Sequence, residues 1–521
     1  MMKSMKNTNV FKNVKKYFKE YSEFTGIHGL RFLTENRSIV EKSFWIVALF
    51  LSSVGCFWMI CEIVDKYQNN PIVVSFATTQ TPLYEIPFPA VTVCPESKCS
   101  EEYFNYSQIY RKVYLSQHLN DTDLQQFHYV SLLCGDLEQN FWLRNGAKTV
   151  GSNFFEVINK LKPDEIISCF DVEGKKCDLT PIVVDQGICY SFNILHRNEI
   201  FREDVFHYED FHQPAIASSN YNDDTRYAKV TDVDTYPARA LLSGADNSLE
   251  LQFKHVQEKS DTLCNKYLQG FRILVHSPTE IPRLSKSYFR VPLDKTIVAA
   301  IDPQLLTTSP AVIKFNSNVR NCYLGNERPL KYFKIYTQSN CELECTTNYT
   351  LNKCGCVQYF MPRTNSTSIC GIGSRDCVSA AEREMKVNEV KNKIPVGDGK
   401  YKLDWECDCK PSCTELRFNV ETSSGEYYWK NFWSDLNSSI IFDDINEYHF
   451  SVLSLYFKRD HFIATERNEL YGITDLISNF GGLLGLFMGF SLISYVEIIY
   501  FLTLRIFYNE KLFGHWSGQA S

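Results

Sequence analysis

The chain contains 521 residues, 44% of them hydrophobic and 22% charged, and its formal net charge at pH 7 is −7. That length is too great for one small domain. The sequence has no HExxH, Walker A, GxSxG or dinucleotide-binding motif, so we find no enzyme site, and the acidic balance gives no reason to expect a nucleic-acid partner.

Residues 1–42 form a basic segment ahead of the first apolar run. They contain nine Lys or Arg residues against four Glu residues. A basic flank beside a membrane span predicts a cytoplasmic location. The segment also contains His28-Gly29, a pair that on its own is typical of a turn glycine next to a surface histidine.

The first apolar run, residues 43–61, has 19 residues without a charge. A signal peptide is the alternative, but the run begins too late, is too long for an h-region and lacks a small-residue cleavage site. Because about 20 apolar residues cross a hydrocarbon core of about 30 Å, we predict a transmembrane helix here.

Residues 62–475 are predicted to be extracellular. They hold 17 of the 19 cysteines, and neither predicted cytoplasmic segment holds any, a segregation typical of disulfides formed in the secretory pathway. The spacings Cys354-x-Cys356 and Cys407-x-Cys409 leave zinc as an alternative. Structural zinc usually needs wider pairs in a reducing compartment, so we expect no metal site. Five glycosylation sequons also fall in this region, at Asn105, Asn120, Asn348, Asn365 and Asn437.

The periodicity within this region predicts a mixed α+β domain. Residues 103–119 and 380–394 have the amphipathic pattern of helices. Residues 215–260 are polar and predict loops around short strands. Alternating or continuous apolar runs predict strands at 85–94, 187–193, 297–301, 414–421 and 451–457.

The second apolar stretch, residues 476–504, opens with 21 uncharged residues and then carries one acid, Glu497. It is longer than a span needs, so the helix must tilt or break. Gly481, Gly485 and Gly489 recur every four residues, which by itself favours close packing against another helix. Glu497 favours the alternative, a helix beside a water-filled pathway, because an ionisable group inside a span is costly.

Seven short motifs occur in a fixed order along the chain: His28-Gly29, Phe88-Pro-Ala-Val-Thr-Val-Cys94, Cys189-Tyr-Ser-Phe-Asn193, Arg320-x-Cys322, Tyr336-x4-Cys341-x3-Cys345, Cys407-x-Cys409-x-Pro411-x-Cys413 and Asn479-Phe-Gly-Gly-x2-Gly-Leu-Phe-x-Gly489-Phe-Ser491. In this combination the chain resembles the degenerin/epithelial sodium channel family and is most similar to its insect pickpocket branch. The resemblance covers both spans and most of the region between them, although residues 100–165 and 195–290 match poorly.

The resemblance implies a trimer around one central pore. Each subunit would have two transmembrane helices flanking a large disulfide-rich extracellular domain with palm, β-ball, finger, thumb and knuckle. Residues 322–413 would be the thumb, a stiff lever that passes extracellular motion to the membrane. The implied disulfides are Cys94–Cys189, Cys169–Cys177, Cys322–Cys413, Cys341–Cys409, Cys345–Cys407, Cys354–Cys377 and Cys356–Cys370. The family pattern leaves the partners of Cys99, Cys134 and Cys264 open.

The resemblance also implies a selectivity filter at Gly489, Phe490 and Ser491, where the helix of the second span opens and narrows the pore. Carbonyl and hydroxyl oxygens are the groups with which a filter replaces the hydration shell of a cation. His28-Gly29 would belong to a cytoplasmic re-entrant segment lining the lower pore, and Glu497 would be the acid of the pore helix.

The gate is implied at the start of the second span. Ser478 would occupy the degenerin position, where a small side chain lets the closed pore pack against a turn at Gly481 and Gly482. Asn479 follows at the position where acid-sensing relatives carry an aspartate.

The resemblance therefore implies a pore-forming subunit of an amiloride-sensitive, sodium-permeable cation channel in the plasma membrane, gated by an extracellular stimulus. Both termini, including the tail 505–521, would be cytoplasmic. The expected partners are membrane lipid, family subunits in a homo- or hetero-trimer, and amiloride as a blocker, with no cofactor besides permeant Na⁺. Two alternatives stay open: an accessory or receptor-like subunit that does not conduct by itself, and a trimeric ATP-gated channel, which would need lysine-rich phosphate contacts.

Overall fold

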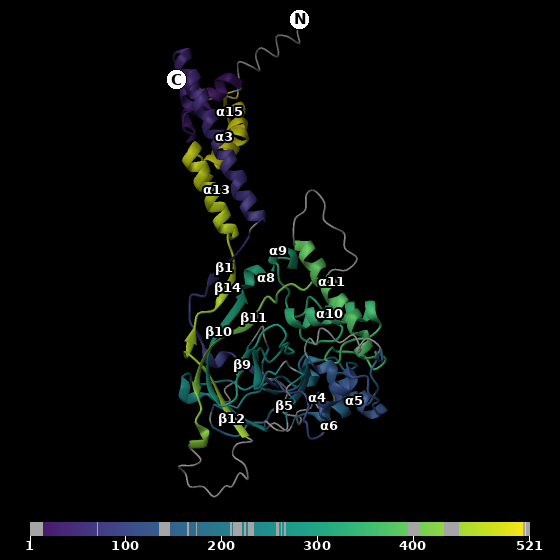
Figure 1. Ribbon diagram of the computed structural model, residues 1–521. Helices are drawn as coiled ribbons and strands as arrows, with labels where there is room; N and C mark the ends of the chain where they lie inside the picture. The colour runs from purple at the N-terminus through teal and green to yellow at the C-terminus, as the bar shows by residue number, and fades with distance from the viewer. Residues whose placement is uncertain are drawn as a thin grey trace. The chain divides into compact units, whose positions relative to one another are not determined.

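A computed structural model describes residues 14–69, 71–134, 146–163, 166–172, 174–208, 211, 221–222, 226–227, 234–256, 260–261, 263–264, 267–393, 407–431, 448–513 and 516. The chain divides into two compact units. The helical unit combines residues up to Val74 with residues from Arg467 onward, and the large unit runs from Ser75 to Glu466. Figure 1 labels the elements of both.

The helical unit contains the two stretches predicted to cross the membrane. Ile39–Asn69 and Leu492–Leu512 are long and apolar enough to span a bilayer, and Ile473–Met488 is a shorter apolar helix. The helices of this unit are 14–24, α2 (Leu30–Thr34), α3 (Ile39–Asn69), α13 (Ile473–Met488), α14 (Leu492–Leu502) and α15 (Leu504–Phe513).

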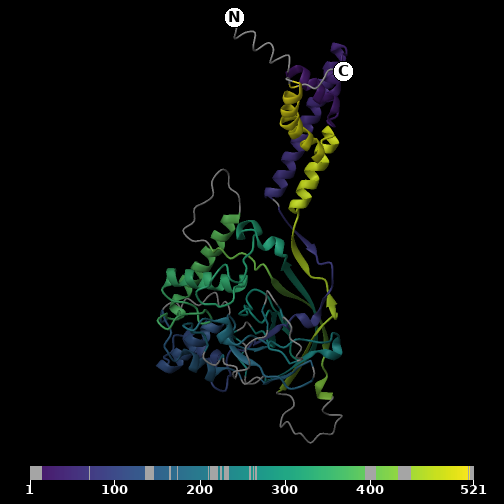
Figure 2. The same ribbon diagram turned by 180° about the vertical axis from the view of Figure 1, so that it is seen from behind.

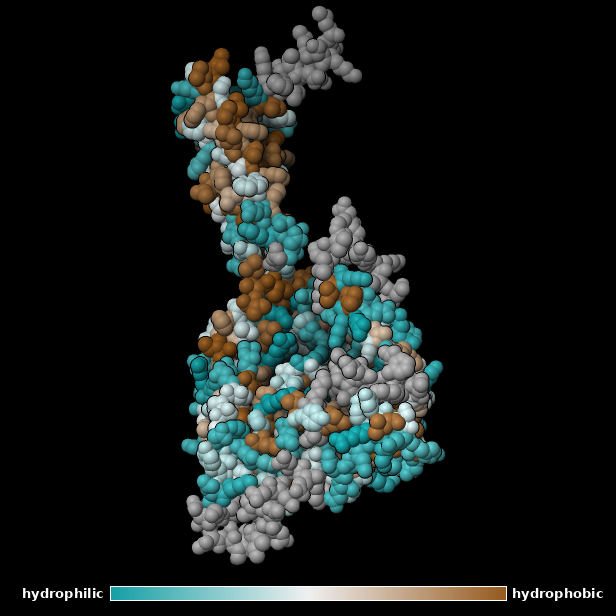
Figure 3. Space-filling view, in the orientation of Figure 1, coloured by the Kyte–Doolittle hydropathy of each residue, from teal (hydrophilic) through white to brown (hydrophobic). Residues whose placement is uncertain are grey.

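Helix α3 extends beyond the predicted first span at both ends. Its 31 residues reach about 46 Å at about 1.5 Å per residue. Phe44, Phe57 and Trp58 are each about two-thirds exposed, and apolar side chains colour much of this unit's surface brown in Figure 3. A helix that is apolar all round needs apolar surroundings, as the predicted membrane span requires.

Helix α13 lies beside α3 in both ribbon views (Figures 1 and 2). Gly481 and Gly482 lie inside α13, which is a continuous helix from Ile473 to Met488. The turn expected at these two glycines is therefore wrong, because glycine inside a membrane helix keeps its backbone hydrogen bonds in the absence of competing water.

The large unit is organised around two sheets. In the first, β10 pairs antiparallel with β11 and parallel with β12, which continues through β7 to β4. Side chains on β10 alternate between buried and half-buried, so one face covers the core. Beyond β10 on the other side, the sheet continues through β14 (Thr465–Glu469) to β1 (Ile72–Phe76). The other strands are β4 (Ile166–Phe170), β7 (Leu249–Val256), β10 (Lys295–Thr308), β11 (Glu415–Glu426) and β12 (Tyr448–Phe457).

The second sheet has the order β5-β6-β3-β8-β9. The motif Phe88 to Cys94 supplies its central strand, and every residue of that strand is buried because the strand has a partner on each side and is covered on both faces. The strands are β3 (Ala90–Pro95), β5 (Thr180–Val184), β6 (Gly187–Phe192), β8 (Phe271–His276) and β9 (Phe289–Val291).

Short strands and helices complete the described part of the chain. β2 (Thr81–Pro82) pairs with β13 (His461–Phe462), and β1 (Ile72–Phe76) and β14 (Thr465–Glu469) include the residues where the two units meet in sequence. The helices are η1 (Leu83–Glu85), α4 (Tyr106–Tyr114), α5 (Asp121–Leu133), α6 (Phe154–Leu161), α7 (Arg197–Ile200), η3 (Ala245–Asn247), α8 (Pro310–Ile313), α9 (Ser317–Arg320), α10 (Gln338–Cys354), η5 (Ile372–Ser374) and α11 (Arg375–Lys393).

Eight disulfides hold the large unit together. Seven join the same cysteines that the resemblance implied: Cys94–Cys189, Cys169–Cys177, Cys322–Cys413, Cys341–Cys409, Cys345–Cys407, Cys354–Cys377 and Cys356–Cys370. The eighth, Cys134–Cys264, joins two of the three cysteines left open. Cys99 keeps a buried thiol, whose pKa is raised by burial and by the nearby carboxylate of Asp261.

Candidate functional site

The second apolar stretch is interrupted at Gly489, Phe490 and Ser491. Gly489 is left-handed, with φ 69° and ψ 19°, and ends α13, whereas Ser491 is extended and begins α14. Glycine reaches this conformation without the cost of about 1–2 kcal/mol that a Cβ imposes. The helix therefore opens at the three residues for which the resemblance implies a filter.

The His-Gly segment contacts this interruption. The backbone N–H of His28 donates a hydrogen bond of 3.0 Å to the carbonyl oxygen of Met488, one of the carbonyls that a helix end leaves without an internal partner. The imidazole covers Gly489, since a Cβ added there would lie 2.7 Å from Cγ and Nδ1 of His28. Gly29, with φ 83°, then begins α2. Two motifs far apart in the sequence thus form one site.

Two serines start the second half of the span. The N–H of Ser494 donates to Oγ of Ser491, and the N–H of Ser491 donates to Oγ of Ser494. Both donor–acceptor distances are 3.2 Å. Such caps satisfy first-turn N–H groups that the helix leaves free. Ser494 is buried, and a Cβ on Gly26 would lie 3.4 Å from its hydroxyl oxygen. Sequence reasoning missed Ser494, although a serine three residues after Ser491 is a recognisable capping pattern.

Helix α13 has two opposite faces. Because a helix repeats every 3.6 residues, Phe487 lies opposite the stripe that contains Ser478, Gly482 and Gly485. Phe487 faces α3, where a Cβ added to Gly55 would lie 3.2 Å from its ring.

The stripe of small residues meets almost nothing. Around Gly481 and Gly482, no described atom beyond the immediate helix backbone would lie within 4 Å of an added Cβ, and at Gly485 only the carbonyl oxygen of Phe490 would, at 4.0 Å. Ser478 is exposed. The close packing predicted from the glycines is therefore not made to another helix within the described part of this chain.

The basic segment packs against the end of the second span. In helix 14–24, the hydroxyl of Tyr17 donates to the carbonyl oxygen of Phe501, and Glu20 forms an ion pair with Arg505. The ring of Tyr21 meets that of Phe501 edge-on, with centroids 5.2 Å apart. These contacts hold the segment that carries His28 close to α14.

A model of the family described as amiloride-sensitive sodium channel matches residues 21–501. The chain belongs to the amiloride-sensitive sodium channel family. The match includes both apolar stretches, His28 and the helix opening, and the family consists of ion channels. The chain is therefore a sodium channel subunit and not an enzyme.

Curated relatives agree with this assignment. Pickpocket protein 28 of Drosophila melanogaster is 27% identical over 516 residues, covering 93% of this chain and 78% of that protein. Sodium channel protein Nach of Drosophila melanogaster is 22% identical, covering 96% and 89%. Acid-sensing ion channel 1C of Danio rerio is 23% identical, covering 91% and 81%. These findings confirm the resemblance predicted from the motifs.

In this sodium channel subunit, Glu497 lies on α14 with a half-buried side chain. Its Oε2 atom is buried and has no hydrogen-bond partner in the described part of the chain. An unpartnered carboxyl oxygen inside a span is costly, so ionisable groups at such positions usually face water or a partner.

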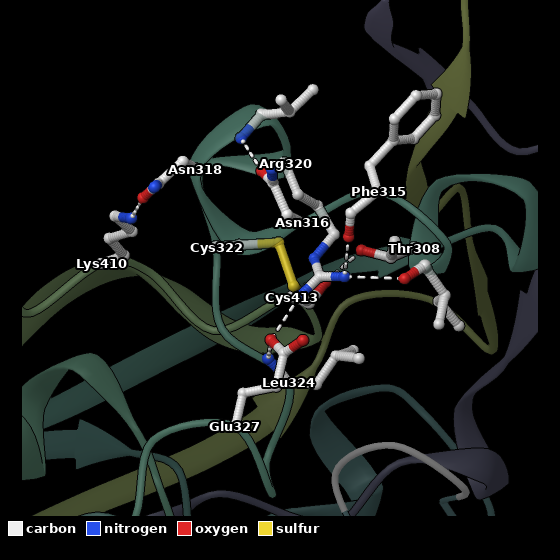
Figure 4. A network of polar contacts seen from close by, with 12 residues as sticks. Thr308, Phe315, Asn316, Asn318, Arg320, Cys322, Leu324, Glu327, Lys410 and Cys413 are labelled. Carbon is white, nitrogen blue, oxygen red and sulfur yellow. Dashed lines mark hydrogen bonds and ion pairs between the residues drawn. A yellow bond between two sulfur atoms is a disulfide. The ribbon is translucent and has the colours of Figure 1, made fainter.

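The base of the implied thumb is held by Arg320, whose side chain is fully buried. Its Nη1 donates to the carbonyl oxygens of Ile313 and Phe315 at 2.8 and 2.7 Å, and Nη2 pairs with Glu327 (Figure 4). The Cys322–Cys413 bridge lies beside this network, and the hydroxyl of Thr308 donates to the carbonyl oxygen of Cys413. The motif Arg320-x-Cys322 thus ties the thumb to the end of β10.

The sequon asparagines differ in setting. Asn105 and Asn120 cap α4 and α5 through their side-chain oxygens, which leaves the amide nitrogen available for a glycan. Asn365 is exposed, whereas Asn348 is half-buried on α10. Asn437 lies outside the described residues.

Proposed function

We propose that the chain is a pore-forming subunit of a trimeric, amiloride-sensitive, sodium-permeable cation channel of the plasma membrane, gated by an extracellular stimulus. The observation that carries this proposal is the opening of the second span at Gly489–Ser491, held by His28. A broken helix at membrane depth exposes backbone oxygens, and these are tolerated only where they are buried in protein or line a watery cavity.

The stripe of small residues on α13 supports assembly with other copies. It lies opposite the face that packs on α3 and has no partner within the described chain. Three such stripes around a common axis would bring bare backbone close together, which is how small residues serve helix contacts in membranes. Ser478 and Asn479 at the start of the stripe would then form the gate, with Gly481 and Gly482 one turn further on.

The chemistry of the opening suits a cation. Carbonyl oxygens near Gly489 and the hydroxyl of Ser491 would replace part of the hydration shell of Na⁺, with Phe490 between them. His28-Gly29 would line the lower pore, and the unpartnered carboxyl of Glu497 would raise the local cation concentration there. Transport is passive, so no cofactor is needed beyond the permeant ion.

The topology follows from charge. The basic segment 1–42 and the tail would be cytoplasmic, which places the large unit outside the cell. There its disulfides would be stable, and the thumb, stapled at Cys322–Cys413, would act as the lever that carries the stimulus towards the gate.

The deciding experiment is whole-cell current from a Ser478→Phe variant expressed alone. A bulky ring on the small-residue stripe should prevent close packing of three subunits and hold the pore open, giving a constitutive current that amiloride blocks and that disappears when Na⁺ is replaced by a large cation. Leu476→Phe is the matched control, because Leu476 is half-buried and lies on the opposite side of α13 from Ser478, and it should give no constitutive current.

Silence of the Ser478→Phe variant, with protein confirmed at the surface, would be followed by co-expression with family subunits. Current that appears only then would identify an obligate heteromer. No current under either condition would refute the pore-forming assignment.

A further inference from the structure

The large unit contains a cavity of about 1000 Å³ beside the two long helices α10 and α11, which lie side by side in Figure 1. Its wall also includes the loop around Arg283 and the turn at Asp185 between β5 and β6. A cavity of this size is at the upper end of the range that small-molecule ligands occupy. The wall is about half apolar, with contributions from Phe360, Val378 and Met385.

Arg283 brings an unpaired cation to this wall. Its side chain forms no ion pair or hydrogen bond within the described part of the chain, and its Nε atom is buried without a partner. Burying a guanidinium N–H without an acceptor is unfavourable, so such groups in native proteins require a specific explanation.

The loop holds Arg283 in place. The carboxylate of Asp185 accepts the backbone N–H groups of Leu284 and Ser285 at 3.1 and 2.8 Å. On the other side, the N–H of Ile281 donates to Asn340 of α10 at 3.3 Å, and both Ile281 and Leu284 are buried. Arg283 is therefore presented from a fixed backbone, which reduces the entropy lost when a ligand binds.

The acids of the wall do not form an ion pair with Arg283. Asp185 is used by the loop backbone, Glu342 pairs with Lys286, and Glu382 accepts from Gln358. The fourth acid, Glu389, is exposed on α11 and has an interaction of its own. Among the bases of the wall, Lys386 on α11 is exposed and, like Arg283, has no ion pair in the described structure. Two cations thus line the cavity without an ion pair in the described part of the chain.

We propose that this cavity binds an organic carboxylate. The anion would pair with the fork of Arg283, a geometry that guanidinium and carboxylate share, while the body of the ligand lies along the apolar part of the wall. Lys386 would add a weaker, hydrated charge at the edge. Binding does not depend on whether the chain conducts, so its failure would leave the proposed channel function untouched.

The test is isothermal titration calorimetry of the full chain in lipid nanodiscs with N-acetyl-L-phenylalanine, which has a carboxylate and an aromatic body. N-acetyl-L-phenylalaninamide, the same molecule without the charge, is the matched probe. We expect the acid to bind at least about tenfold more tightly than the amide.

Variants assign that difference to Arg283. Arg283→Gln should lose about tenfold in affinity for the acid and none for the amide, Arg283→Lys should lose less, and Arg383→Gln, an exposed arginine of α11 outside the wall, should lose none. Because the Arg283 side chain makes no hydrogen bond or ion pair in the described part of the chain, Arg283→Gln should not lower the thermal midpoint of unfolding.

Equal binding of acid and amide would overturn the proposal, as would an Arg283→Gln variant with unchanged affinity. Absence of binding up to about 10 mM, where a ligand with a Kd of about 1 mM would be largely bound, would overturn it as well. A lower thermal midpoint for Arg283→Gln would make Arg283 a structural residue.

Discussion

Residues 322–413, the implied thumb, and the second span are held together by opposite means. Five disulfides link residues 322 to 413, and the buried guanidinium of Arg320 closes the base of this region. The second span has no covalent tie, and its midpoint is a glycine in a left-handed conformation covered by one imidazole. One region is built so that its shape is hard to change, and the other so that small contacts decide it.

The difference assigns separate roles. A cross-linked element transmits displacement without absorbing it, whereas an element stabilised by a few weak contacts has alternative conformations within a few kcal/mol. Substitutions in the thumb should therefore act mainly on folding, and substitutions in the second span mainly on conduction.

The largest effect is expected from removing the outermost thumb bridge. The double variant Cys322→Ser/Cys413→Ser should lose about 2–5 kcal/mol of unfolding free energy, because the unfolded chain gains the freedom of a 91-residue separation. Thermal unfolding of the purified chain measures the loss. Cys61→Ser, at an unpaired cysteine of α3, is the control. An unchanged midpoint in the double variant would show that the thumb is not the rigid partner.

The next effect concerns the helix opening. Gly489→Ala places a residue with a Cβ in the left-handed conformation, which costs about 1–2 kcal/mol of conformational energy. The new methyl group would also overlap the imidazole of His28. We expect current to be lost or the reversal potential to shift, in recordings made on the Ser478→Phe background. Gly425→Ala, in β11 and outside the span, has no positive φ and meets open space, so it serves as the control. Identical currents in wild type and Gly489→Ala would show that this contact does not shape the pathway.

Acid should weaken the large unit without touching its bridges. Burial lowers the pKa of His207 to about 3 and that of His276 to about 4. An unfolded histidine has a pKa of about 6.5, so the folded state binds fewer protons below that pH. Stability should be constant above about pH 6.5 and fall on acidification towards these folded pKa values, by up to about 1.4 kcal/mol per pH unit for each histidine.

Denaturant midpoints at about pH 7.5 and about pH 5.5 measure this fall. His207 stacks on Phe201, so His207→Phe keeps an aromatic ring in the site and should remove its share of the acid sensitivity. A variant with the same pH dependence as the wild type would exclude His207 as a source.

The smallest effect separates packing within a subunit from packing between subunits. Gly481→Ala meets open space in the described chain and should favour the helix by about 0.5–1 kcal/mol. If the small-residue stripe joins subunits, the same change should reduce the trimer fraction on cross-linking, whereas Leu476→Ala, on the opposite side of α13, should not. A trimer fraction unaffected by Gly481→Ala would place the stripe outside the subunit interface.

Local pattern predicted some elements well and others poorly. Residues 187–193 alternate along β6, and 380–394 overlap α11, which begins earlier at Arg375. The strand predicted at 297–301 is longer in the structure, where it runs from Lys295 to Thr308. The prediction stopped early because Asp302 and Pro303 interrupt the apolar alternation. In the structure Pro303 stays in the sheet, in register with Phe418 of β11. Pairing across a sheet, invisible in the local pattern, extends the strand.

Helix α10 and the Cys134–Cys264 bridge were missed for related reasons. Three cysteines and several buried Asn and Thr residues give α10 no apolar stripe, since disulfides and side-chain hydrogen bonds hold it in the core. The two bridged cysteines are 130 residues apart in segments without a clear pattern. In the candidate site, the glycine spacing predicted an unusual helix. The contact between His28 and Gly489 could not be predicted, because only the tertiary structure brings these two segments together.

The hydrogen bond from His28 to Met488 also constrains the order in which the protein can fold during synthesis. The donor is translated before the first span and the acceptor near the middle of the second, so the ribosome must complete almost the whole chain before the two can meet. Until then the carbonyl of Met488 lacks its hydrogen bond from His28, and the basic segment lacks the end of the second span against which it packs. The large unit, whose sheets and bridges lie between the two apolar stretches in sequence, can fold and form its disulfides before this contact exists.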